Sequence, residues 1–242
     1  MLSDRLRQWA FERGLRRRSV VTHAPFSRAV YRSLVQRWSV RSRLEIAPFE
    51  TTTPVASSTR LFFRHDIDYA DCVKYGPDML GIHLDTKVAL SIFIRVDAEA
   101  YAPASARELV GMASKAGVLV GLHTSCYVHE DYLAALQRER RVFEDSFGFA
   151  PKAFTVHGLG SLHLDRRTAF TQHATEHLEE LGFLYSDCTA TLRPYSHVFQ
   201  DCDVDPISGQ RSLYSDFLSP PLLPARRRNF LVLAHPCYWT KP

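Results

Sequence analysis

Acidic residues and histidines stand at the ends of several apolar segments of this sequence. They are Asp66 with Asp68, His123, His157, Asp187 and His235. Each one alone has an ordinary structural explanation, since an aspartate in such a place often caps a helix. Their recurrence at five segment ends is harder to explain by capping. Carboxylates and imidazoles are the ligands and the acid–base groups of metal-assisted hydrolysis, so the pattern predicts a site for that chemistry.

A divalent metal ion is the cofactor that this residue set favours, with Zn²⁺ as the first choice. Two histidines and one aspartate would leave one coordination position open for water. The ion would lower the pKa of that water toward about 7 and polarise a substrate carbonyl.

Apolar segments and helix-compatible segments alternate from residue 61 onward. Strands are expected at 61–64, 87–96, 118–123, 153–157, 183–187 and 230–234. Helices are expected between the first two strands, where Pro77 would open a helix, and at 105–116, 130–147 and 167–181. The segment 188–225 has no clear assignment. The alternation predicts an α/β fold with parallel strands, either closed like a barrel or open and doubly wound, whose strand ends gather the acidic residues and histidines.

The composition is that of an ordinary globular protein. The chain has 242 residues, of which 45% are hydrophobic and 12% aromatic, enough for a sizeable core. No apolar run reaches the roughly 18–20 residues that cross a bilayer, and the first residues do not resemble a secretory signal. Five cysteines without tight spacing do not predict a disulfide framework. A reducing, cytoplasmic setting is therefore expected.

Positive charge is concentrated at the start of the chain. Residues 1–43 contain eleven arginines and two acidic residues, whereas the remainder is net acidic, so no nucleic-acid surface is expected on the body. This basic segment, expected to be helical, could contact an anionic membrane, pack as a charged helix on the body, or act as a transit peptide. Residues 44–60 read as a connector, and residues 61–242 as the catalytic domain.

Three short segments resemble motifs of one family. Residues 64–68 (RHDID) resemble the first motif of the polysaccharide deacetylases, the NodB-homology or carbohydrate esterase family 4 group, in the branch that reads His-Asp-x-Asp. Residues 121–124 (GLHT) are similar to its second motif, and residues 233–235 (LAH) to its last. All three occur in the family's order, each after an expected strand, and together they cover roughly residues 61–240.

The resemblance implies a fold, a reaction and four residue roles. The fold would be a distorted (β/α)7 barrel of the glycoside hydrolase/deacetylase type. The reaction would be hydrolytic removal of an acetyl group from an acetylated amino sugar or a glycan intermediate. Asp66 would match the catalytic base, Asp68 and His123 the metal ligands, and His235 the catalytic acid.

The sequence departs from the family pattern in three places, one of which is His65, where the family usually has an apolar residue before the first aspartate. The family's second metal histidine follows the first by four residues, where this chain has Tyr127; His129, two residues further on, could replace it only if the segment is loop-like. The family's third motif has an arginine that contacts the base, whereas the matching strand here ends at His157, a candidate substrate-binding or acid–base residue. Arg95 and Asp187 are further candidates, Arg95 for an acidic group of the substrate and Asp187 to orient a histidine.

Two other functions compete with a deacetylase. A non-catalytic relative could keep the fold and bind glycan without turnover, which the irregular second motif would favour. A glycosyltransferase could also use Asp66-Ile67-Asp68 as a metal-chelating Asp-x-Asp. Only about 60 residues precede this motif, fewer than the roughly 100 of a nucleotide-binding half.

Overall fold

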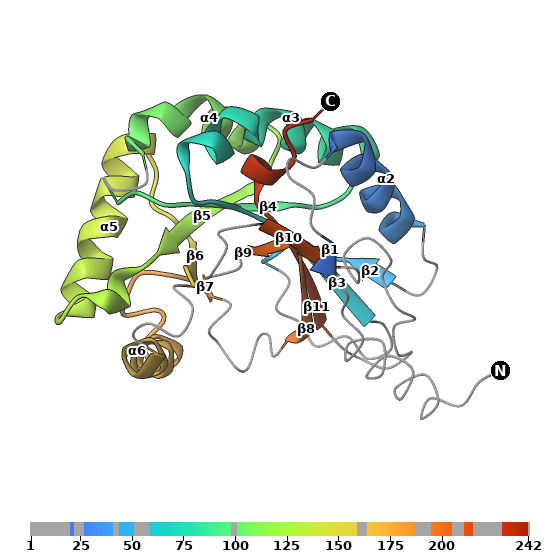
Figure 1. Ribbon diagram of the computed structural model, residues 1–242. Helices are drawn as coiled ribbons and strands as arrows, with labels where there is room; N and C mark the ends of the chain where they lie inside the picture. Colours follow the sequence, from blue (N-terminus) through green and yellow to red (C-terminus); the bar gives the residue numbers. More distant parts are fainter. Residues whose placement is uncertain are drawn as a thin grey trace.

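The structure is a computed structural model that describes residues 20–21, 27–40, 44–50, 59–97, 101–158, 164–186, 195–204, 211–214 and 229–241. Its helices are α2 (Arg28–Ser39), α3 (Ala70–Thr86), α4 (Arg107–Lys115), α5 (Tyr132–Phe147) and α6 (Leu164–Glu176), with short 3₁₀ turns η1 (Pro103–Ala106), η2 (Cys126–Val128) and η3 (Pro236–Tyr238). Figure 1 shows that α2, α3, α4 and α5 form an arc along one side of a curled sheet, with α6 beyond α5.

The main sheet is parallel and curls into a half-barrel. Its order is β7-β6-β5-β4-β3-β11-β8, and β2 pairs with the first residues of β3. Its strands are β2 (Leu44–Ile46), β3 (Thr59–Ile67), β4 (Ser91–Ile94), β5 (Leu119–Thr124), β6 (Ala153–Val156), β7 (Tyr185–Ser186), β8 (Tyr195–Gln200) and β11 (Asn229–Ala234). A small antiparallel sheet joins β1 (Val20–Val21), β10 (Arg211–Tyr214) and β9 (Cys202–Val204). The predicted α/β, barrel-like fold class is confirmed.

Most predicted elements are present, with two differences in helix limits. Six strands of the main sheet overlap the six predicted from the sequence, and α5 ends at Gly148, whose φ of 80° is the left-handed conformation that glycine adopts readily. Pro77 does not open a helix: α3 begins seven residues earlier, at Ala70, and contains Pro77 in its interior. Helix α6 ends at Glu176 rather than at residue 181.

Helix α2, inside the predicted basic segment, packs into the core. Tyr31, Leu34, Val35 and Trp38 recur at helical spacing and are fully buried. Two of its arginines form ion pairs with aspartates on α3: Arg28 with Asp78, and Arg32 with Asp85. Residues 1–19 of the basic segment lie outside the described residues. In the part of the chain that the structure describes, no helix combines the length and the apolar character that crossing a membrane requires.

The Tyr31 hydroxyl links α2 to β3 and to α3 by hydrogen bonds. It lies 2.7 Å from Nε2 of His65 on β3 and 3.0 Å from Nε2 of His83 on α3, and all three side chains are buried. The Nδ1 atom of His83 is 3.2 Å from the carbonyl oxygen of Val88, so Nδ1 carries the proton and Nε2 accepts from Tyr31. Tyr31 also packs against Trp239, with ring centroids 5.0 Å apart.

Candidate functional site

The candidate side chains stand where neighbouring parallel strands of the half-barrel end. Asp66 lies near the end of β3 and Asp68 just after it, His123 lies near the end of β5, and His157 and His235 directly follow β6 and β11. The strand register places His123 beside Thr155 of β6, and Ala234, which precedes His235, beside His65 of β3. Because parallel strands point the same way, the C-terminal ends of all four meet at one rim.

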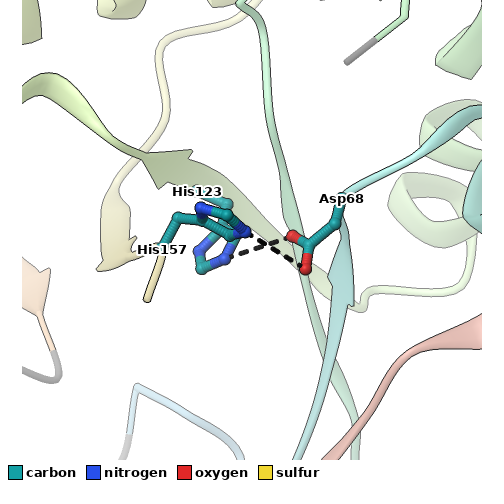
Figure 2. A group of neighbouring side chains, drawn as sticks. All are labelled: Asp68, His123 and His157. Atoms are coloured by element: carbon teal, nitrogen blue, oxygen red, sulfur yellow. Dashed lines mark ion pairs between the residues drawn. The ribbon is translucent and has the colours of Figure 1, made fainter. Parts of the chain in front are cut away.

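Asp68, His123 and His157 form a compact group that could hold a metal ion. Nε2 of His123 is 3.3 Å from Oδ1 of Asp68, and Nε2 of His157 is 3.5 Å from Oδ2. One ligand atom from each residue lies within 4.8 Å of the other two, and all three side chains are buried. Figure 2 shows both imidazoles turned toward the carboxylate.

The spacing and chemistry of this group fit a tetrahedral zinc ion. Two atoms bonded to one zinc ion at about 2.0–2.2 Å, at a tetrahedral angle, are about 3.3–3.6 Å apart. Nε2 of His123 lies at such a distance from Oδ1 of Asp68, and Nε2 of His157 lies at such a distance from the other carboxylate oxygen, Oδ2. Oδ1 of Asp68 is buried without a hydrogen-bond partner among the described residues. A buried carboxylate oxygen in that state is destabilising unless a cation compensates it. Two nitrogens and one carboxylate oxygen are a ligand set that zinc accepts.

A threonine orients one of the imidazoles. Nδ1 of His123 is 2.7 Å from the Thr155 hydroxyl oxygen, and both side chains are buried. When Nε2 presents its lone pair to an ion, Nδ1 carries the proton and donates it to this hydroxyl, which fixes the ring. The pKa of Asp68 is lowered from its usual value: burial opposes this, but the imidazoles of His157, His123 and His235 favour the carboxylate. Asp68 is therefore ionised at neutral pH.

His235 contacts the carboxylate of Asp68 through one ring nitrogen and the carboxylate of Asp201 through the other. Its Nε2 atom is 3.5 Å from Oδ2 of Asp68, and its Nδ1 atom is 2.8 Å from Oδ1 of Asp201. Oδ2 of Asp201 accepts hydrogen bonds from the main-chain N–H of His235 at 2.7 Å and from Nε1 of Trp239 at 2.8 Å. Burial opposes the charged ring, but Asp201, Asp68 and Asp66 raise the pKa of His235 to about 10. His235 is therefore an imidazolium that can donate a proton.

Asp201 does not figure among the residues expected from the sequence. It directly follows β8, so the strand-end rule that selected His123 and His235 applies to it as well. Asp201 was not selected because β8 lies in the segment 188–225, whose composition does not predict a strand.

Asp66 is held by an arginine from its own strand. The guanidinium of Arg64 donates to Oδ2 of Asp66 at 2.7 Å, and the same oxygen is 3.5 Å from Nε2 of His123. Residues i and i+2 of a strand share a face, which brings the two side chains together. Burial raises the pKa of Asp66, while Arg64 acts in the opposite direction. The resemblance implied an arginine beside the base from the third motif; here β3 supplies it.

His129, expected as the third metal ligand, does not reach the group. It is exposed and directly follows η2, where its N–H donates to the carbonyl of Cys126 and its backbone is extended. The chain thus leaves the rim at this point and leads into α5. The structure places His157, expected to bind substrate, beside Asp68 and His123 instead.

The structure says less about the two remaining candidate residues, Arg95 and Asp187. Arg95 follows β4 at the same rim and is mostly buried, and its guanidinium pairs with Asp97, which also accepts from the Ser125 hydroxyl at 3.3 Å. A substrate-binding role for Arg95 stays a prediction. Asp187 lies outside the described residues.

The arrangement combines a cation site with a proton acceptor and a proton donor. Asp68 contacts both histidines of the group, Asp66 lies beside His123, and His235 faces Asp68. An ionised carboxylate next to a metal ion can take a proton from water, and an imidazolium can give one to a leaving group. These parts lie together at the rim of the half-barrel, and metal-assisted hydrolysis is the chemistry for which they are suited.

Comparisons with known proteins found matches among solved structures. No family model and no curated protein matches the chain. One matching solved structure is a mutant of a CE4 family pseudoenzyme with restored enzymatic activity, with a TM-score of 0.42 and 13% identity over 73% of this chain. The chain spans 56% of that protein's length. Another is a peptidoglycan deacetylase of Bdellovibrio bacteriovorus, with a TM-score of 0.30, 12% identity and coverage of 94% of this chain and 68% of that one.

Proposed function

We propose that this protein is a metal-dependent hydrolase that removes the acetyl group of an N-acetylated amino sugar, free or within a glycan intermediate. The observation that carries the proposal is the juxtaposition of the Asp68–His123–His157 group with a carboxylate and an imidazolium, each held by its own buried partner. Zn²⁺ is the ion that this ligand set favours. When bound, it would polarise the acetyl carbonyl and lower the pKa of a water molecule.

Asp66 would act as the general base. Its carboxylate would accept a proton from the attacking water while the water oxygen forms a bond to the acetyl carbon. Burial raises the pKa of Asp66, and the ion pair with Arg64 favours the ionised form that a general base requires. The high pKa that burial promotes also makes the carboxylate a stronger proton acceptor.

His235 would act as the general acid. An amine leaves poorly as an anion, so the C–N bond breaks readily only if its nitrogen receives a proton. The ring faces the group through Nε2, and Asp201 holds Nδ1 from the other side, so Nε2–H is the proton aimed at the site. The products would be acetate and the free amine of the sugar.

Asp66 and Asp68 have different partners, which disfavours a glycosyltransferase that would use both as an Asp-x-Asp metal chelator. In that reading Asp66 and Asp68 would chelate one cation together. In the structure Asp66 is paired with Arg64, and Asp68 alone joins the two histidines.

Two measurements on the purified full chain test the proposal. The first is zinc content and affinity of the wild type and of His123→Ala, with His173→Ala on α6 as the matched control. The second is acetate release from a panel of N-acetylated sugars, in which Asp66→Asn should lower the rate about 10²–10⁴-fold. The exposed Asp71→Asn in the first turn of α3 is the control and should keep the rate.

The outcomes separate the candidate functions. Stoichiometric zinc that His123→Ala abolishes, together with acetate release, supports the hydrolase. Zinc or glycan binding without acetate release on any sugar would indicate a non-catalytic glycan-binding protein. A wild type that binds no divalent ion would overturn the proposal.

A further inference from the structure

We propose that Tyr127 is a positioning residue that holds His157 in the metal group through the main chain. The inference rests on the proposed function, because it assigns His157 as a metal ligand. Tyr127 is fully buried on η2, and its hydroxyl donates to the carbonyl oxygen of His157 at 2.8 Å. This bond reaches the main chain of His157 and not its ring.

The two imidazoles of the group are held in different ways. The ring of His123 is bonded at Nδ1 to the Thr155 hydroxyl. Nδ1 of His157 is buried and has no hydrogen-bond partner among the described residues. A metal-binding histidine usually has its second ring nitrogen bonded to a carboxylate, carbonyl or water, which orients the ring. Within the described part of the chain, the His157 ring is therefore positioned by its backbone and by its contacts with Asp68 and His123.

That backbone is anchored on both sides by the segment that follows His123. The N–H of His157 donates to the carbonyl of Thr124 at 2.8 Å, and its carbonyl accepts from Tyr127. The β-ladder between β5 and β6 ends at Val156, so these two bonds continue the connection one residue further. The turn that carries Tyr127 is itself fixed, since the N–H of Cys126 donates to the Thr124 hydroxyl at 3.0 Å.

Removal of the Tyr127 hydroxyl should weaken metal binding while leaving the ring packed. Tyr127→Phe preserves the buried aromatic volume and leaves the buried carbonyl of His157 without this donor. Loss of a group that orients a metal ligand typically lowers metal affinity about 10–100-fold. We expect a loss of this size for zinc, with no loss when a tyrosine hydroxyl is removed elsewhere in the core.

The experiment is a zinc titration of the full chain against a chromophoric chelator. The variants are Tyr127→Phe, His157→Ala and the matched control Tyr31→Phe, which also removes a buried hydroxyl but whose partners, His65 and His83, lie outside the group. Melting temperatures of the metal-free proteins measure the purely structural cost of each change. The inference predicts weaker zinc binding for Tyr127→Phe and His157→Ala, and wild-type affinity for Tyr31→Phe.

The failures of the two proposals are distinguishable. If His157→Ala weakens zinc binding and Tyr127→Phe does not, or if Tyr31→Phe weakens it equally, the positioning role is wrong and the metal site stands. If His157→Ala leaves zinc affinity unchanged, His157 is not a ligand and the inference falls with it. If the wild type binds neither zinc nor another divalent ion, both the inference and the proposed function are overturned.

Discussion

The support that Asp201 gives to His235 leads to the most direct prediction, through the change Asp201→Asn. The substitution keeps the size and shape of the side chain and removes its negative charge. Asp201 is fully buried and accepts hydrogen bonds from the ring and the main chain of His235 and from Trp239. The carboxamide can keep only part of this pattern, and it no longer favours a charged imidazole.

The size of the effect can be estimated from the bond that is weakened. A hydrogen bond to a charged group contributes about 1.5–3 kcal/mol. Since 1.36 kcal/mol corresponds to one pKa unit, the pKa of His235 should fall by about 1 to 2 from its wild-type value. Asp68 and Asp66 remain nearby and continue to raise it. The decrease should therefore stop above the ordinary histidine pKa of about 6.5.

The assay is a pH titration of the His235 ring resonances by NMR in the metal-free wild type and variant. Urea unfolding supplies a second measurement. Because the folded-state pKa is raised, the charged ring stabilises the fold fully below the unfolded pKa, and this contribution is lost as the pH rises through about 10. The stability that Asp201→Asn loses through His235 should therefore shrink as the pH approaches and passes 10.

Two results would refute this reasoning. One is an equal pKa for His235 in the wild type and in Asp201→Asn. The other is a wild-type pKa near the ordinary histidine value, which would mean that burial outweighs the surrounding carboxylates.

Three further changes test the packing around the site. Gly121→Ala would place a methyl group 2.5 Å from a ring carbon of Phe93, and the overpacking should lower the free energy of unfolding by about 1–3 kcal/mol in urea denaturation. Arg64→Met leaves the buried Asp66 carboxylate unpaired, so it should cost about 3–5 kcal/mol and shift the acid limb of the pH–rate profile upward; an unshifted limb would contradict the pairing. Tyr31→Phe leaves two buried imidazoles without their shared hydroxyl and should cost about 1–3 kcal/mol, whereas an unchanged unfolding midpoint would show that this contact is dispensable.

The strands and the residues at their ends could be predicted from the sequence. Short apolar runs bounded by turn residues are local signals, and they located the six strands that overlap β3, β4, β5, β6, β7 and β11. The C-terminal ends of parallel strands lie at one rim, which predicted that Asp68 and His123 meet. In the structure, Oδ1 of Asp68 lies 3.3 Å from Nε2 of His123. The buried face of α2, which includes Tyr31 and Trp38, was not identified, because arginines stand between its apolar residues.

The sequence by itself determined which residue types stand at the strand ends, because alternating apolar and polar segments act over a few neighbours. Only the tertiary structure decided which of them meet. His157 rather than His129 joins the group because the chain after η2 turns outward while the β5–β6 register brings the end of β6 inward. Asp201 reaches His235 through the pairing of β8 with β11, a contact between segments more than thirty residues apart. Such distances depend on how the whole sheet curls, and no local pattern encodes them.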